Sequence, residues 1–182
     1  MIIAIDPGYA VKGDGCAVAI FTSSAIPNTI LLRGTCFDRP EIVRDRCIAI
    51  ESIVRVIWEC PQLDARSRRA TPAVVGLAAT GGELAGLYAG ANAGTIERVT
   101  PAQWKGSVPK PIAHARTWRV LTPHEREILG GATTEAAIAA AQKKGALDRW
   151  GKDGARYYPA RFTMHNLLDA VGIGLWAIGG RS

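Results

Sequence analysis

The sequence has 182 residues, a length that suits one domain with a full core and is short for two ordinary domains. Hydrophobic residues make up 48% of the chain and charged residues 21%, a balance that excludes wholesale disorder. The chain shows neither an apolar run of 18 residues nor a basic leader, which argues against a membrane-spanning helix and a secretory signal. We therefore expect residues 1–182 to form a single cytoplasmic domain with no membrane partner.

Basic charge is concentrated in the second half of the chain. The net charge is +6, but residues 98–161 hold twelve Lys or Arg against five Asp or Glu, a net charge of +7, which leaves −1 for the rest. A regional excess suits a polyanionic partner such as nucleic acid, although a solvated basic face has the same composition. The candidate phosphate contacts are Lys105, Lys110, Arg116, Arg119, Lys143, Lys144, Arg149, Lys152, Arg156 and Arg161.

The first part of the chain predicts three antiparallel strands. Residues 1–6 and 15–21 are short apolar runs on either side of a glycine-rich stretch, and 29–36 alternates well enough to be a third strand. In residues 40–53 apolar side chains recur every three to four positions behind a Pro-Glu start, which predicts a helix. The compact apolar run 54–58 then predicts a strand with a parallel partner, because a helix precedes it.

Residues 72–91 predict a helix in which Gly82, Gly86 and Gly90 recur every four positions. Each internal glycine costs a helix about 1 kcal/mol relative to alanine, so a regular stripe of them needs a packing reason. The stripe lets another backbone come close, either the sheet of the same chain or the same helix of a second subunit, and the sequence favours neither. Residues 95–99 predict the last strand.

The remainder of the chain is predicted to be mostly helical. Helices are expected over 113–120, 123–129, 133–144 and 163–178. A polar loop is expected over 146–159, and it contains Trp150, Tyr157 and Tyr158. These aromatic rings can either stack on an unpaired nucleic-acid base or pin the loop to the core.

Two carboxylates stand at the ends of predicted apolar strands. Asp6 ends the first strand, and Glu59 follows the strand 54–58. A carboxylate at such a place is costly unless it is solvated, paired or bound to metal. If the two strands are neighbours, both side chains leave the sheet at the same edge. Each residue taken alone can also be an exposed one that opens a turn.

The closing helix carries a second polar group. His165 and Asp169 are four residues apart and Asn166 and Asp169 three apart, so all three fit along one helix edge. Mg²⁺ prefers oxygen ligands, and imidazole also suits Mn²⁺. Two such ions can together catalyse phosphodiester hydrolysis. The candidate metal ligands and catalytic residues for this reaction are Asp6, Glu59, His165 and Asp169. A histidine at the start of a helix can instead be a cap or a surface residue.

Four segments of the sequence resemble the RuvC family of Holliday junction resolvases, within the RNase H-like nuclease superfamily. They are the opening hairpin 3–8 (IAIDPG) with 15–19 (GCAVA), the strand 56–59 (VIWE), the strand-to-helix element 99–105 (VTPAQWK) and the closing helix 165–170 (HNLLDA). Their order and spacing span essentially the whole chain, which is far more specific than the Asp-Pro-Gly match alone.

The resemblance implies an α/β protein of the RNase H-like fold, with a mixed five-stranded sheet whose first three strands are antiparallel and which is flanked by helices. It also implies a homodimeric DNA endonuclease that uses two Mg²⁺ or Mn²⁺ ions per site and resolves four-way junctions by paired symmetrical nicks. The expected setting is a bacterial or phage-infected cell. The compact length is similar to that of phage-borne members, which extends the expected substrates to other branched DNA.

Three points stay open at the level of sequence. The residue that precedes Asp169 in the site is either His165 or Asn166, and we favour His165 because an amide is the weaker ligand. The segment 121–162 is longer than the family's usual connection, so the resemblance does not define its role. An RNA-processing nuclease and a non-catalytic nucleic-acid-binding protein of the same fold are the alternative functions, and the intact acidic residues argue against the second.

Overall fold

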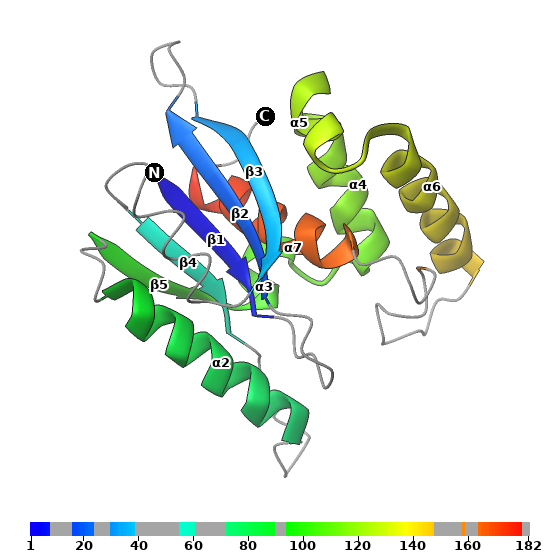
Figure 1. Cartoon of the computed structure of the whole chain (residues 1–182). Helices are drawn as coiled ribbons and strands as arrows, with labels where there is room; N and C mark the ends of the chain where they lie inside the picture. Colours follow the sequence, from blue (N-terminus) through cyan, green and yellow to red (C-terminus); the bar gives the residue numbers. More distant parts are fainter. Residues whose placement is uncertain are drawn as a thin grey trace.

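The computed structural model describes residues 1–7, 16–23, 30–38, 55–60, 72–89, 94–147, 158 and 164–179. Its strands are β1 (Ile2–Asp6), β2 (Cys16–Ser23), β3 (Ile30–Asp38), β4 (Arg55–Glu59) and β5 (Thr95–Val99). They form one sheet in the order β3-β2-β1-β4-β5 (Figure 1). The pairs β1–β2 and β2–β3 are antiparallel, whereas β1–β4 and β4–β5 are parallel. This strand order and direction confirm the predicted mixed sheet and define an RNase H-like α/β fold.

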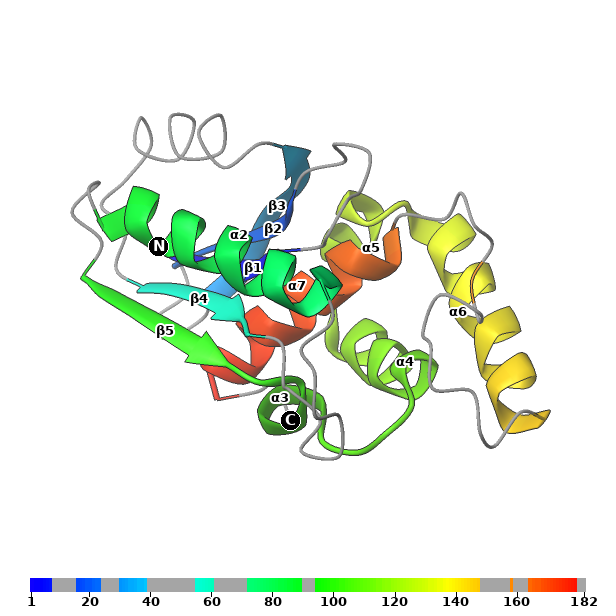
Figure 2. The same ribbon diagram turned by 90° about the horizontal axis from the view of Figure 1, so that it is seen from below.

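Helices cover both faces of the sheet. On one face α2 (Pro72–Ala89) contacts β4 and β5, and on the other α7 (Met164–Ala177) contacts β1 and β2 (Figure 2). The other described helices are α3 (Pro101–Lys105), α4 (Lys110–Val120), α5 (Pro123–Ile128) and α6 (Gly131–Leu147). Both α3 and α4 pack on α7, and α6 packs on α4. Within the described ranges, no helix has the length and apolar character needed to cross a membrane.

Some predicted bounds change. The helix predicted over 113–120 begins earlier, at Lys110, because Pro109 at the cap and Pro111 in the first turn suit positions whose N–H groups have no helical partner. The loop predicted over 146–159 loses its first two residues to α6, which ends at Leu147. The helix predicted over 40–53 lies outside the described residues.

The apolar run of β1 is buried on both faces of the sheet, which explains why it lacks polar alternation. Ile3 and Ile5 face the cluster that contains Trp58, whereas Ile2 and Ala4 face the cluster that contains the apolar residues of α7. Side chains alternate along a strand, so Asp6 follows Ala4 onto the α7 side. The strand end therefore delivers the Asp6 carboxylate toward α7.

The glycine stripe of α2 points away from the sheet of its own chain. A Cβ atom built on Gly82 or Gly86 would meet nothing within 4 Å, and both residues are exposed. The glycine that lets α2 approach the sheet is Gly81, where a Cβ would lie 2.1 Å from the Trp58 ring. Gly90 lies outside the described residues.

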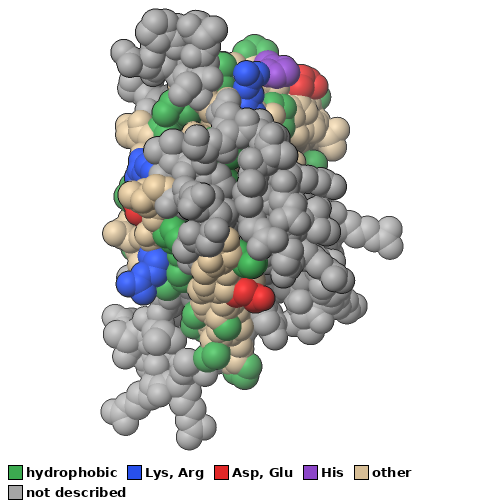
Figure 3. Space-filling view, turned by 60° about the vertical axis from the view of Figure 1, so that its left-hand side comes forward, with side chains coloured by type: hydrophobic (Ala, Val, Ile, Leu, Met, Phe, Trp, Pro, Cys, Tyr) green, Lys and Arg blue, Asp and Glu red, His purple; other side chains and the backbone are tan. Residues whose placement is uncertain are grey.

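Figure 3 brings the left-hand side of Figure 1 forward, and the described surface there shows scattered blue side chains with no continuous basic patch.

Candidate active site

Three predicted carboxylates lie close together between the sheet and α7. The parallel register pairs Ile5 with Trp58, so the next residues along each strand, Asp6 and Glu59, are neighbours at the carboxyl end of β1 and β4. Asp169 projects from α7, and its negative charge adds to the rise in the pKa of Glu59 that burial causes. Asp6 is 9% exposed and Asp169 is 3% exposed. Sheet register and one helix thus build an acidic site in the protein interior.

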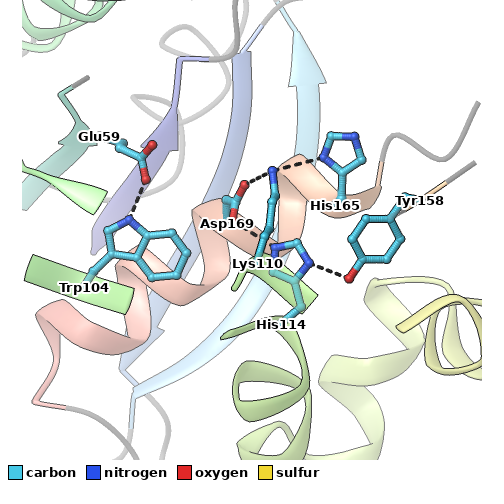
Figure 4. A network of polar contacts seen from close by, with 7 residues as sticks. All are labelled: Glu59, Trp104, Lys110, His114, Tyr158, His165 and Asp169. Atoms are coloured by element: carbon cyan, nitrogen blue, oxygen red, sulfur yellow. Dashed lines mark hydrogen bonds and ion pairs between the residues drawn. The ribbon is translucent and has the colours of Figure 1, made fainter. Parts of the chain in front are cut away.

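Lys110 supplies the positive charge inside this acidic site. From the first turn of α4 its ammonium pairs with Oδ2 of Asp169 and lies 3.3 Å from Nδ1 of His165 (Figure 4). Burial lowers the pKa of Lys110, but the charges of Asp169, Asp6 and Glu59 outweigh it and raise the pKa overall. The sequence placed Lys110 among the phosphate contacts, whereas the structure places its amine between the candidate metal ligands.

Glu59 is held by an indole. Nε1 of Trp104 donates a hydrogen bond of 2.5 Å to Oε2 of Glu59 (Figure 4). Burial raises the pKa of Glu59, the positive charge of Lys105 opposes that rise, and the net direction is upward. The motif 99–105 drew attention to this element for its basic residue, but the sequence did not show that Trp104 would orient the carboxylate of Glu59.

His114 is a second residue that the sequence analysis missed. It is fully buried, its Nε2 lies 2.9 Å from Oδ1 of Asp169, and its Nδ1 lies 2.7 Å from the hydroxyl of Tyr158. Burial raises the pKa of Asp169, but Lys110 and His114 reverse that effect and hold it below the usual range of an aspartate. The available signal was spacing, because Lys110 and His114 are four residues apart on one helix and share a face.

His165 borders the site at the start of α7. Its ring stacks on Tyr158 with a centroid distance of 5.7 Å and an interplanar angle of 24°, and its Nδ1 faces Lys110. Burial and the neighbouring Lys110 lower the pKa of His165 to about 4. Asn166 hydrogen-bonds to His165, so both candidates for the residue that precedes Asp169 in the site lie together at the start of α7.

We expect His165 to titrate near pH 4. The unfolded chain takes up a proton at this imidazole near pH 6.5, so stability falls as the pH decreases from about 6.5 to about 4, by a few kcal/mol at most. The change is measured by proton NMR of the imidazole and by urea denaturation across this range. A His165→Asn variant identifies the NMR signal, and its shallower pH dependence separates this residue from His114, whose pKa is also lowered by burial.

The donor set suits a hard divalent cation. Within the described part of the chain, no three His, Cys, Asp or Glu side chains are arranged so that they could hold a metal ion directly. The negative charges of Asp6, Glu59 and Asp169 nevertheless all act on one cation, the ammonium of Lys110. This ammonium shows that the three carboxylates together attract a positive charge. Carboxylate oxygens are the ligands that Mg²⁺ prefers, so the chemistry of these side chains suits such an ion.

The other basic candidates lie in three kinds of place. Lys105 lies with its ammonium 4.8 Å from the centroid of the Trp104 ring, and together with Arg116 it borders a cavity of about 470 Å³ beside α7. The exposed side chains of this set on α4 and α6 belong to Arg116, Arg119, Lys143 and Lys144. The candidates that lie outside the described residues are Arg149, Lys152, Arg156 and Arg161.

The chain is similar in fold to solved resolvase structures. No family model and no curated protein matches the sequence. The structure of Thermus thermophilus RuvC is 17% identical with a TM-score of 0.48, over 96% of this chain and 90% of that chain. The fowlpox virus Holliday junction resolvase is 17% identical with a TM-score of 0.45, over 98% and 97%. Its complex with substrate junction DNA is 19% identical with a TM-score of 0.41, over 71% and 85%. Similarity at this level concerns the fold alone.

Proposed function

We propose that this protein is a metal-dependent endonuclease that resolves four-way DNA junctions and cuts related branched DNA. The observation that carries the proposal is the meeting of Asp6, Glu59 and Asp169 at one buried site on an RNase H-like sheet. Asp6, Glu59, Asp169 and His165 would hold Mg²⁺ or Mn²⁺, two ions per site, which activate water and stabilise the leaving oxygen. The choice of junction DNA rests on the sequence motifs, and membership of a phage-type subgroup is part of the same proposal.

The protein's own groups prepare the site before substrate arrives. Trp104 fixes the Glu59 carboxylate by its hydrogen bond, and burial keeps bulk water away from Asp6 and Asp169. Lys110 neutralises part of the negative charge and thereby limits repulsion among the carboxylates. Lys105 lies near this site, since its charge acts on Glu59, and it is a good candidate to meet a phosphate of the scissile strand.

The proposal is tested by incubating the protein with a synthetic four-way junction and with linear duplex, with and without Mg²⁺, beside an Asp6→Asn variant. We expect Mg²⁺-dependent paired nicks in the junction and none with the variant. If the unaltered protein cuts neither DNA with any divalent ion, the enzyme proposal fails. Cleavage of a structured RNA in preference to the junction would favour the RNA-processing alternative, and binding without cleavage would favour a non-catalytic protein.

Paired nicks require two active sites related by a two-fold axis, so the proposed enzyme acts as a homodimer. The exposed stripe around Gly82 and Gly86 on α2 is the surface we propose for this contact. Replacing Gly86 with leucine is then expected to yield a monomer by light scattering, because the new side chain separates the two helix backbones. Ala140→Leu on the exposed face of α6 is the matched control. If the Gly86→Leu protein stays dimeric, α2 does not form the dimer interface.

A further inference from the structure

His114 links Asp169 to Tyr158 in a line of three buried side chains. The imidazole comes from α4, the carboxylate from α7, and the phenol from Tyr158, which stands in the long segment between α6 and α7 (Figure 4). His114 is 0% exposed, Asp169 is 3% exposed and Tyr158 is 5% exposed. Tyr158 therefore does not offer its ring to a nucleic-acid base, and of its two predicted roles the structure supports packing of this side chain on the core.

The hydrogen-bond directions in this line follow from the chemistry of its ends. Asp169 is ion-paired with Lys110, and a carboxylate only accepts, so Nε2 of His114 must carry the proton that it donates. In a neutral imidazole the other nitrogen is then an acceptor, and the Tyr158 hydroxyl donates to Nδ1. This tautomer of His114 satisfies both partners, whereas the alternative tautomer would turn the lone pair of Nε2 toward Asp169 and lose that hydrogen bond, although its Nδ1–H could still donate to Tyr158.

The two oxygens of Asp169 are thereby distinguished. Oδ1 accepts from His114, which is packed on every side, whereas Oδ2 pairs with Lys110. Whether or not Lys110 leaves Oδ2 when a divalent ion binds, His114 can stay in place and keep the carboxylate plane fixed. Groups that donate to a ligating carboxylate from behind typically change metal affinity by about 10- to 100-fold when they are removed.

Tyr158 adds a second restraint on the same site. While its hydroxyl holds His114, its ring stacks on His165 at 5.7 Å between centroids. One side chain thus contacts His165 directly and Asp169 through His114. A purely space-filling tyrosine would need no hydroxyl here, and a buried hydroxyl without a partner would be costly.

We propose that His114 and Tyr158 are positioning residues that orient the carboxylate of Asp169 for divalent-ion binding. The proposal rests on the proposed metal-dependent function, because it assigns these residues to the same site. It makes Tyr158 part of the machinery that sets metal affinity. Neither residue contacts substrate in this scheme, since both act through Asp169 and His165.

The decisive variant is Tyr158→Phe, which removes one oxygen and keeps the ring on His165. Mn²⁺ binding to the DNA-free protein is measured by electron paramagnetic resonance of the free ion. We expect the dissociation constant to rise about tenfold in Tyr158→Phe and up to about 100-fold in His114→Ala. His114→Gln, whose amide can still donate to Asp169, should recover most of the affinity. Thr133→Val on the exposed face of α6 also removes one hydroxyl, and as the matched control it should bind like the unaltered protein.

Nitrogen-15 NMR of the metal-free protein provides a readout that needs no metal. The proposal requires a proton on Nε2 of His114 and none on Nδ1, and the opposite tautomer would overturn the hydrogen-bond scheme. Thermal unfolding shows whether each variant is folded. If Tyr158→Phe and His114→Ala are folded and bind Mn²⁺ as tightly as the unaltered protein, the positioning role is wrong while the proposed function stands. If the unaltered protein binds no divalent ion, the proposed function fails and the positioning role fails with it.

Discussion

Replacing Asp169 with asparagine is expected to lower the rate of metal-dependent DNA cleavage by at least about a thousandfold while DNA binding persists. Asp169 is the carboxylate that contacts both Lys110 and His114, and its charge also acts on Glu59. An amide keeps the size of the side chain but removes the negative charge that a divalent ion needs. Single-turnover cleavage of a four-way junction and a gel-shift assay in EDTA measure the two properties separately.

The same change is expected to destabilise the fold, because it leaves Lys110 buried without its partner. Breaking a buried ion pair on one side costs about 3–5 kcal/mol. The pKa of Asp169 is held below its usual range, so its stabilisation is present above about pH 4 and is lost as the pH falls further. Urea denaturation of Asp169→Asn at pH 7 and at lower pH should therefore show a difference that shrinks with acid.

Glu97→Gln is the matched control for Asp169→Asn. Glu97 pairs with Arg55 at 2.9 Å, but the two side chains are 30% and 40% exposed, so the loss of this pair costs less than about 1 kcal/mol. Cleavage by this variant should equal that of the unaltered protein. Full activity in folded Asp169→Asn would exclude Asp169 from the chemistry, and equal losses in both variants would point to a general effect of charge.

The sequence was sufficient to predict that Asp6 and Glu59 lie side by side, because their positions follow from local periodicity. The apolar run of β1 ends at Asp6 and that of β4 ends at Glu59, and parallel pairing brings the two ends together. The apolar spacing that predicted the closing helix agrees with the burial of Leu167, Leu168 and Val171 in α7.

Lys110, His114 and Trp104 could not be assigned from sequence because their roles depend on how α3 and α4 dock on α7. The basic region around Lys110 led to the prediction that this lysine contacts phosphate. Only tertiary packing shows that its amine reaches Asp169. The orientation of the glycine stripe of α2 likewise depends on tertiary packing. Its spacing predicted one face, and the structure was needed to show that Gly82 and Gly86 face outward.

Lys110→Met is expected to tighten divalent-ion binding by about tenfold or more. The Lys110 ammonium pairs with Asp169 and is attracted by Asp6 and Glu59, so an incoming ion must compete with it for the same negative charge. Two unit charges at about 4 Å interact with roughly 4 kcal/mol at an effective dielectric constant near 20. The cost of moving the amine back into water offsets part of that energy, and a net 1.4 kcal/mol corresponds to tenfold in affinity.

The same variant separates metal affinity from stability. Without metal, the buried carboxylates lose their counter-charge, and we expect a loss of about 3–5 kcal/mol of stability. Added Mg²⁺ binds only the folded protein, so it should raise the melting temperature of Lys110→Met more than that of the unaltered protein. Lys143→Met, on the exposed surface of α6, is the matched control and should leave both quantities unchanged.

Calorimetric titration with Mg²⁺ and thermal unfolding at several Mg²⁺ concentrations decide between two arrangements of Lys110. Tighter binding by Lys110→Met means that the ammonium and the ion occupy the site in turn, as the contact with Oδ2 of Asp169 suggests. Weaker binding would mean that Lys110 stays beside the ion, and its amine would then be directed at the substrate phosphate instead of the carboxylates. In the first case, cleavage by Lys110→Met should reach half its maximum at a lower Mg²⁺ concentration than cleavage by the unaltered protein.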